Sequence, residues 1–64
     1  MYSNRMKEIR QEKGIQLTAL SAKTGISIGY LCHLEKGTRT NPSADIMEKI
    51  AKGLEKTVVD VFFK

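Results

Sequence analysis

The segment between Leu17 and Lys36 constrains the fold most, because it must form two short helices joined by a tight turn. Small or apolar residues recur through it at Leu20, Ser21, Thr24, Ile26, Leu31 and Leu34. Gly25 stands where the turn needs a positive φ, which glycine adopts without steric cost. A helix of about eight residues is hardly stable alone. The predicted helices, about 17–24 and 28–36, must therefore lock together, and a small side chain at Ser21 lets them approach.

Another helix is predicted before this pair, from about Asn4 to Lys13. Met6 and Ile9 lie on its inner side. Gly14 follows at the position where a helix commonly ends in the left-handed conformation. The short connection to the next helix is typical of a helical bundle.

Three hydroxyl residues stand where helix N-caps are expected. Ser27 precedes the helix that Gly37 ends, and Ser43 precedes a fourth helix. The fourth helix has an apolar stripe at Ile46, Met47, Ile50, Ala51 and Leu54. Thr57 precedes the short apolar segment VVDVFF, which forms one last helical turn or two. The sequence therefore predicts an all-α fold, a compact bundle of five short helices in one domain over residues 1–64.

Composition argues against several classes of protein. The chain has one cysteine, Cys32, which excludes a disulfide within it and fits a reducing cytosol. Cys32 and His33 are adjacent and lack a matching ligand cluster, so we expect no metal, cofactor or small-molecule ligand. One histidine and one cysteine leave little material for catalysis, so no enzyme is expected. The sequence has no apolar run long enough to span a membrane, so we expect a cytoplasmic protein.

The positive charge is concentrated in residues 1–40, which carry seven basic and three acidic side chains. The whole formal net charge of +4 therefore lies there. A basic pole on a small domain suggests a polyanionic partner, most often nucleic acid. A solvated lysine-rich surface explains the charge equally well, and Lys23 fits that simpler interpretation.

The motifs together resemble a known family, the phage repressor and Cro type of helix-turn-helix DNA-binding domain, often called the Xre family. The resemblance covers Arg5 to Phe62, nearly the whole chain, and rests on IRQEKGI, LSAKTGIS, YLCHLEKG, TNPS, IMEKIAKGL and VVDVF. Within the family the chain is most similar to the DNA-binding domains of Bacillus-type biofilm and sporulation repressors. The implied fold is that of the lambda-repressor-like domains, with the helix-turn-helix at about 17–36.

The resemblance implies that the third helix enters the major groove with its first turn nearest the bases. The residues placed toward DNA are Ser27, Ile28, Gly29, Cys32 and His33. Many relatives have glutamines at the positions of Leu17, Ile28 and Gly29, where they form bidentate contacts to adenine. None of the three residues in this chain can make that contact. Base reading is then expected from Ser27, Ile28 and His33. Cys32 is expected to be a contact or a spacer rather than a thiol sensor.

Gly29 is unusual, because glycine in the first turn of a helix costs about 1 kcal/mol relative to alanine. We expect it to remove a side chain where the DNA backbone or a thymine methyl comes close. The alternative is that glycine is merely tolerated there. Tyr30 either reaches a phosphate with its hydroxyl or packs at the helix edge.

Phosphate contacts are expected at two places. The first is the start of the second helix, where Gln16 and the backbone N–H groups of Leu17 and Thr18 suit an anion. The second is the loop after the third helix, which contributes Lys36, Thr38, Arg39, Thr40 and Asn41. In relatives an arginine and a glutamate at the positions of Arg10 and Glu35 pair, which implies a structural ion pair that pins the recognition helix.

The C-terminal segment, about 54–64, is too apolar for its length and is expected to mediate dimerisation. The predicted interface residues are Leu54, Val59, Phe62 and Phe63. A two-fold homodimer would place two recognition helices about 34 Å apart, one turn of DNA, on a roughly palindromic operator. The alternative is that this patch packs against another domain.

The resemblance thus implies a sequence-specific regulator of transcription that binds double-stranded DNA as a homodimer, with repression the commoner outcome in the family. The second reading is a protein-interaction module, such as an antitoxin or adaptor, that binds DNA only weakly. It predicts salt-sensitive DNA binding with little sequence preference and a stable complex with another chain.

Overall fold

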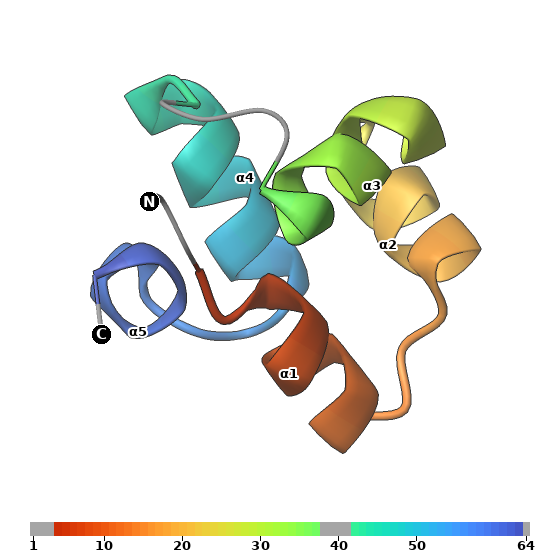
Figure 1. The fold of residues 1–64 in the computed structure, drawn as a ribbon, viewed down its shortest axis with the longest axis horizontal. Helices are drawn as coiled ribbons and strands as arrows, with labels where there is room; N and C mark the ends of the chain where they lie inside the picture. Colours follow the sequence, from red (N-terminus) through yellow and green to blue (C-terminus); the bar gives the residue numbers. More distant parts are fainter. Residues whose placement is uncertain (1–3, 38–41, 64) are drawn as a thin grey trace.

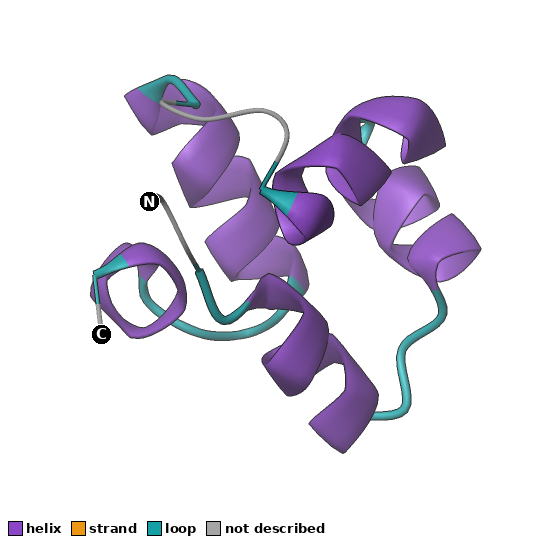
Figure 2. Ribbon diagram, viewed as in Figure 1, coloured by secondary structure: helices purple, strands orange, loops and turns teal. Residues whose placement is uncertain are grey.

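The structure, a computed structural model, describes residues 4–37 and 42–63 of the 64-residue chain. Within these ranges the backbone forms five helices and no strand. Figures 1 and 2 show how the helices are arranged. The helices are α1 (Met6–Glu12), α2 (Leu17–Thr24), α3 (Ile28–Lys36), α4 (Ala44–Gly53) and α5 (Val58–Phe62). The prediction of an all-α bundle of five short helices is confirmed.

Three helices begin at the hydroxyl caps that the sequence indicated. Ser27 Oγ accepts the N–H of Tyr30 at 3.2 Å at the start of α3. Ser43 and Thr57 make the same contact at the starts of α4 and α5, at 3.2 and 3.1 Å. Each cap satisfies one of the backbone donors that a helix N-terminus leaves unpaired.

Helix α1 is shorter than predicted, at both ends. Asn4 lies outside it, because its Oδ1 accepts the N–H of Met6 at 2.9 Å in a local turn. At the other end the helix stops at Glu12, with Lys13 as the C-cap. Gly14 then takes a φ of 68°, which turns the chain toward α2.

The core draws side chains from all five helices and the turns between them. Its fully buried large side chains are Met6, Ile9, Leu20, Leu31, Leu34, Ile50, Leu54 and Val61. Helix α4 packs against both α2 and α5, so it connects the helix-turn-helix to the C-terminal helix (Figure 1). In the described ranges no polar or charged residue is buried as a whole, although the side chains of Arg10 and Glu35 are largely covered.

Gly53 allows the close approach of α2 and α4. A Cβ on this residue would lie 2.8 Å from Thr24 Cγ2 and 3.0 Å from Leu20 Cδ1. Leu20 is fully buried and Thr24 is held by hydrogen bonds, so neither neighbour has room to move aside. The glycine therefore fixes how α2 rests on the core.

Candidate nucleic-acid interface

The turn between α2 and α3 is held by side chains as well as by glycine. Gly25 ends α2 with a φ of 74°. Ser21 Oγ then donates to the carbonyl of Ile26 at 2.6 Å, and Thr24 Oγ1 accepts the N–H of Ile26 at 3.2 Å. The role of Ser21 therefore goes beyond small size, because its hydroxyl ties α2 to the residue just before the α3 cap.

Helix α3 divides cleanly into an inner and an outer face. Leu31 and Leu34 are fully buried, and they anchor the helix in the core. The side chains predicted to face DNA occupy the other side, with Ser27, Ile28, Gly29 and His33 exposed and Tyr30 and Cys32 half-buried. Ile28 is 43% exposed, which is unusual for an isoleucine and leaves an apolar side chain available to a partner.

Gly29 is not required by packing within the chain. A Cβ built on it would meet nothing within 4 Å, and its φ is not in the left-handed region. An alanine would fit there and favour the helix more. Whether DNA approaches at this position stays a prediction.

The start of α2 and the end of α3 are the two places where phosphate contacts are predicted. Gln16 and Thr18 are exposed and Leu17 is half-buried. Gln16 has an extended conformation and makes no side-chain cap, so its amide group is not used to cap α2. Lys36 is exposed at the end of α3, whereas Thr38, Arg39, Thr40 and Asn41 lie outside the described residues. Lys23 is exposed and lines a hollow between α2 and α4 with Lys49 and Lys52.

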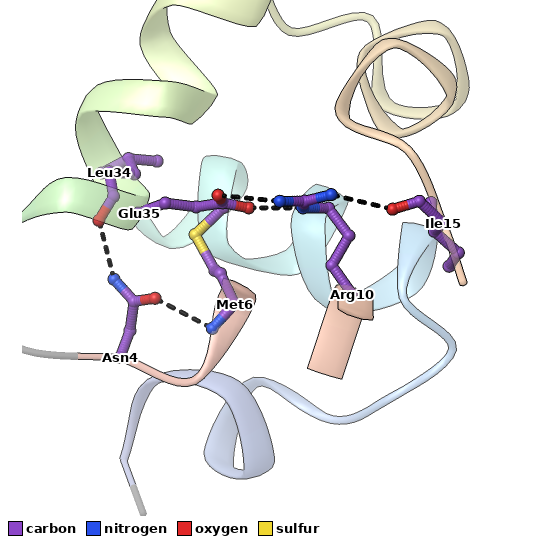
Figure 3. Close-up of polar contacts among 6 residues, drawn as sticks. All are labelled: Asn4, Met6, Arg10, Ile15, Leu34 and Glu35. Carbon is purple, nitrogen blue, oxygen red and sulfur yellow. Dashed lines mark hydrogen bonds and ion pairs between the residues drawn. The ribbon is translucent and has the colours of Figure 1, made fainter. Parts of the chain in front are cut away.

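An ion pair joins α1 to α3. Arg10 Nε donates to Glu35 Oε2 at 2.7 Å and Nη2 donates to Oε1 at 3.2 Å, while Nη1 donates to the carbonyl of Ile15 at 3.0 Å (Figure 3). The side chains of Arg10 and Glu35 are only 14% and 7% exposed. The guanidinium thus links three places: α1, the end of α3 and the residues that lead into α2.

Sequence reasoning missed a second link between these helices. Asn4 Nδ2 donates to the carbonyl of Leu34 at 3.0 Å, across 30 positions of the chain (Figure 3). The sequence pattern predicts Asn4 as the first residue of the helix and indicates no role for its side chain. Its contact with α3 depends on the tertiary fold and has no sequence signal of its own.

The predicted dimer surface needs a correction. Leu54 is fully buried and Phe62 is only 6% exposed, so both belong to the core of a single chain. Val59 and Phe63 are 53% and 66% exposed and form the apolar surface that remains. Leu54 is the C-cap of α4 and belongs to the buried core cluster, so the segment begins inside the core.

The described ranges contain no group of three or more histidine, cysteine or acidic residues that could hold a metal ion. Cys32 is a free, half-buried thiol. None of the described helices is long and apolar enough to cross a membrane.

Comparison with known proteins places this geometry in context. A helix-turn-helix family model matches residues 6–61. The HTH-type transcriptional regulator SinR of Bacillus subtilis (strain 168) is 38% identical over 58 residues, which is 91% of this chain and 52% of SinR. The HTH-type transcriptional regulator DdrOP3 of Deinococcus deserti is 40% identical over 57 residues, 89% of this chain and 43% of that protein. The chain thus spans about half the length of the curated relatives it matches.

Two solved structures are similar over most of this chain. One is a crystal structure of SinR, the master regulator for biofilm formation, in complex with DNA. The TM-score is 0.80 and the sequences are 39% identical, over 84% of this chain and 86% of the SinR chain in that structure. The other is a complex of SinR with SinI, with a TM-score of 0.80 and 38% identity. The similarity covers 86% of this chain and 53% of the chain in that complex.

Proposed function

Because the chain belongs to the helix-turn-helix family, whose model matches residues 6–61, we propose that it is a sequence-specific, double-stranded-DNA-binding regulator of transcription. The observation that carries the proposal is the outer face of α3. This short helix is anchored by two fully buried leucines, and it presents an exposed isoleucine, serine and histidine on the side away from the core. Side chains held in this way suit readout of base edges in the major groove.

Base reading is assigned to the first two turns of α3. His33 and Ser27 offer hydrogen-bonding groups, and Ile28 offers an apolar contact for a thymine methyl. Gly29 leaves room for the close approach of the duplex. Cys32 and Tyr30 lie at the edges of this face, where they are half-buried.

Phosphate contacts are assigned to the start of α2 and the end of α3. Gln16, Thr18 and the first N–H groups of α2 form a neutral donor set, and Lys36 adds a positive charge. By sequence alone, the loop residues Thr38, Arg39, Thr40 and Asn41 extend this set. Charge supports the assignment, because the formal net charge of +4 lies within residues 1–40.

The proposal includes a homodimer and repression. Val59 and Phe63 leave an exposed apolar surface at α5 that a second copy would cover. A two-fold dimer would present two α3 helices to successive major grooves and select a roughly palindromic site. A regulator of this kind represses by occupying a promoter.

The test selects sites from a random duplex library with the wild-type chain and measures binding by fluorescence anisotropy over a salt series. His33→Ala should lower the preference for the selected duplex over a scrambled one. Lys36→Gln should weaken both alike and reduce the salt slope by about one unit, the loss of one phosphate contact. Lys56→Gln removes the same charge between α4 and α5 and is the matched control.

An interaction module is the competing outcome. It predicts that no consensus emerges and that binding fades with salt alike for every duplex. The assignment of a phosphate contact to Lys36 fails if Lys36→Gln and Lys56→Gln have the same small effect, because the charge of Lys36 would then act at long range only.

A further inference from the structure

The side-chain amide of Asn4 makes hydrogen bonds to two helices, α1 and α3. The Oδ1 atom accepts the N–H of Met6 at 2.9 Å, and Nδ2 donates to the carbonyl of Leu34 at 3.0 Å (Figure 3). Both groups of a partly buried amide are therefore used. One bond sets the start of α1 and the other reaches the last turn of α3.

The carbonyl of Leu34 is an informative target. It is one of the last four carbonyls of α3, which lack the usual partner within a helix. The N–H of Gly37 already donates to it at 3.2 Å from the C-cap. Asn4 adds a donor from outside the helix, so this contact restrains the position of α3 rather than its length.

The neighbouring residue makes a parallel contact to another helix. The N–H of Arg5 donates to the carbonyl of Val61, in the last turn of α5, at 2.8 Å. Two successive residues before α1 therefore tie together the C-terminal ends of α3 and α5. Helix α3, assigned to base reading, and helix α5, assigned to the dimer, are therefore both hydrogen-bonded to the segment that precedes α1.

Two contacts restrain a helix end more than one does. Arg10 holds the side chain of Glu35, and the buried Leu31 and Leu34 anchor the inner face of α3 in the core. The bond from Asn4 to Leu34 adds a second polar contact next to Glu35. Because α3 has nine residues and is about 13 Å long, a small rotation at this end displaces the first turn, which lies nearest the bases.

We infer that Asn4 is a positioning residue for base recognition: its Nδ2 donor fixes the orientation of α3 relative to α1. The inference rests on the proposed function for its DNA readout, but the orientation itself is measurable without DNA. It assigns a role in base recognition to a residue that lies outside the predicted DNA contacts.

Two variants separate the contact to α3 from the local turn. Asn4→Asp is nearly isosteric and keeps an acceptor for the N–H of Met6, but as a carboxylate it cannot donate to Leu34. Asn4→Ser keeps a neutral, shorter acceptor that does not reach α3. Ile50→Val, in the core part of α4, serves as the control for lost stability without a lost contact to α3.

The first measurement is the orientation of α3 relative to α1 and α4 in the free protein, from backbone residual dipolar couplings. The second is the ratio of affinities for the selected and scrambled duplexes, at a temperature where every variant is folded. Both Asn4 variants should reorient α3 and lower the ratio by about tenfold, roughly one base contact, with scrambled-duplex affinity unchanged. Ile50→Val should change neither.

Unchanged couplings in both Asn4 variants would overturn the inference, as would a reoriented α3 whose selectivity matches that of Ile50→Val. If the wild-type chain prefers no duplex, the proposed function fails. The dipolar couplings then decide alone whether Asn4 positions α3.

Discussion

Replacing Glu35 with leucine should remove a large part of the stability of this domain. Glu35 receives two hydrogen bonds from Arg10, at 2.7 and 3.2 Å, and the two side chains are only 14% and 7% exposed. Removing one partner of a buried pair costs about 3–5 kcal/mol, because the remaining charge stays in a poorly hydrated site. At usual values per residue, a 64-residue chain has a total unfolding free energy of about 3–10 kcal/mol. Glu35→Leu is therefore expected to lose at least about a third of this free energy, and to unfold if the total lies at the lower end of the range.

The double variant tests whether the cost comes from the unpaired charge. Arg10→Met combined with Glu35→Leu removes both charges and fills the space with apolar groups, so most of the stability should return. Urea unfolding followed by far-ultraviolet circular dichroism gives the four free energies of the cycle, with an expected coupling of at least about 2 kcal/mol.

The exposed pair of Arg5 and Glu8, 35% and 57% exposed, provides the control, and Glu8→Leu should shift the midpoint little. The reasoning is refuted if Glu35→Leu costs less than about 1 kcal/mol and the two single effects simply add.

Other parts of the fold carry further predictions. Gly53→Ala should lower the unfolding free energy by about 1–2 kcal/mol, since its Cβ would lie 2.8 Å from a threonine methyl of α2 and overpacking outweighs the gain in helix propensity; a rise in thermal midpoint would contradict this. Gly29→Ala, with open space around its Cβ, should leave stability equal or higher yet weaken binding to the selected duplex; unchanged affinity would mean that DNA does not approach there. Phe63→Ser should weaken self-association in analytical ultracentrifugation without lowering stability, because the side chain is 66% exposed; an unaltered dimer would place the interface elsewhere. Arg5 lowers the pKa of the Glu8 carboxyl through a hydrogen bond and its charge. The small stabilisation from this pair is therefore present above the ordinary carboxyl pKa of about 4.3 and is lost as pH falls through the lowered pKa. Thermal midpoints of wild type and Glu8→Gln should converge at acid pH, and a constant difference between them would contradict this pH dependence.

Features that depend on neighbouring residues could be predicted from the sequence. The hydroxyl caps at Ser27, Ser43 and Thr57 and the left-handed glycines at Gly25 and Gly37 set helix ends through contacts a few positions apart. These signals are local, so they placed α2 at its observed bounds and the starts of the three helices that follow. Family resemblance then supplied the pairing of α1 with α3, which local signals do not encode.

Features that depend on packing could not be predicted in the same way. Leu54 and Phe63 are both large apolar residues in one short segment, yet one is fully buried and the other is 66% exposed. Only the path of the chain after α4 decides between them. The contact of Asn4 with Leu34 and the requirement for glycine at Gly53 likewise arise where distant helices meet.

The sequence could predict which side of α3 is exposed, but not which bases its side chains would contact. The residues assigned to DNA on α3 lie on its exposed or half-buried side, as the position of the buried Leu31 and Leu34 requires. Which base each side chain reads depends on the geometry of a duplex against α3. That information lies in neither the sequence nor the free chain.

The most direct test of the central claim is a competition between duplexes near physiological salt. The wild-type chain would first select its consensus from a random library, and its affinities for that consensus and for a scrambled duplex would then be compared. A specific regulator should yield a two-fold-symmetric consensus that it binds at least about 10³ times more tightly. A ratio near one, with no consensus, would contradict the account and direct attention to a protein partner.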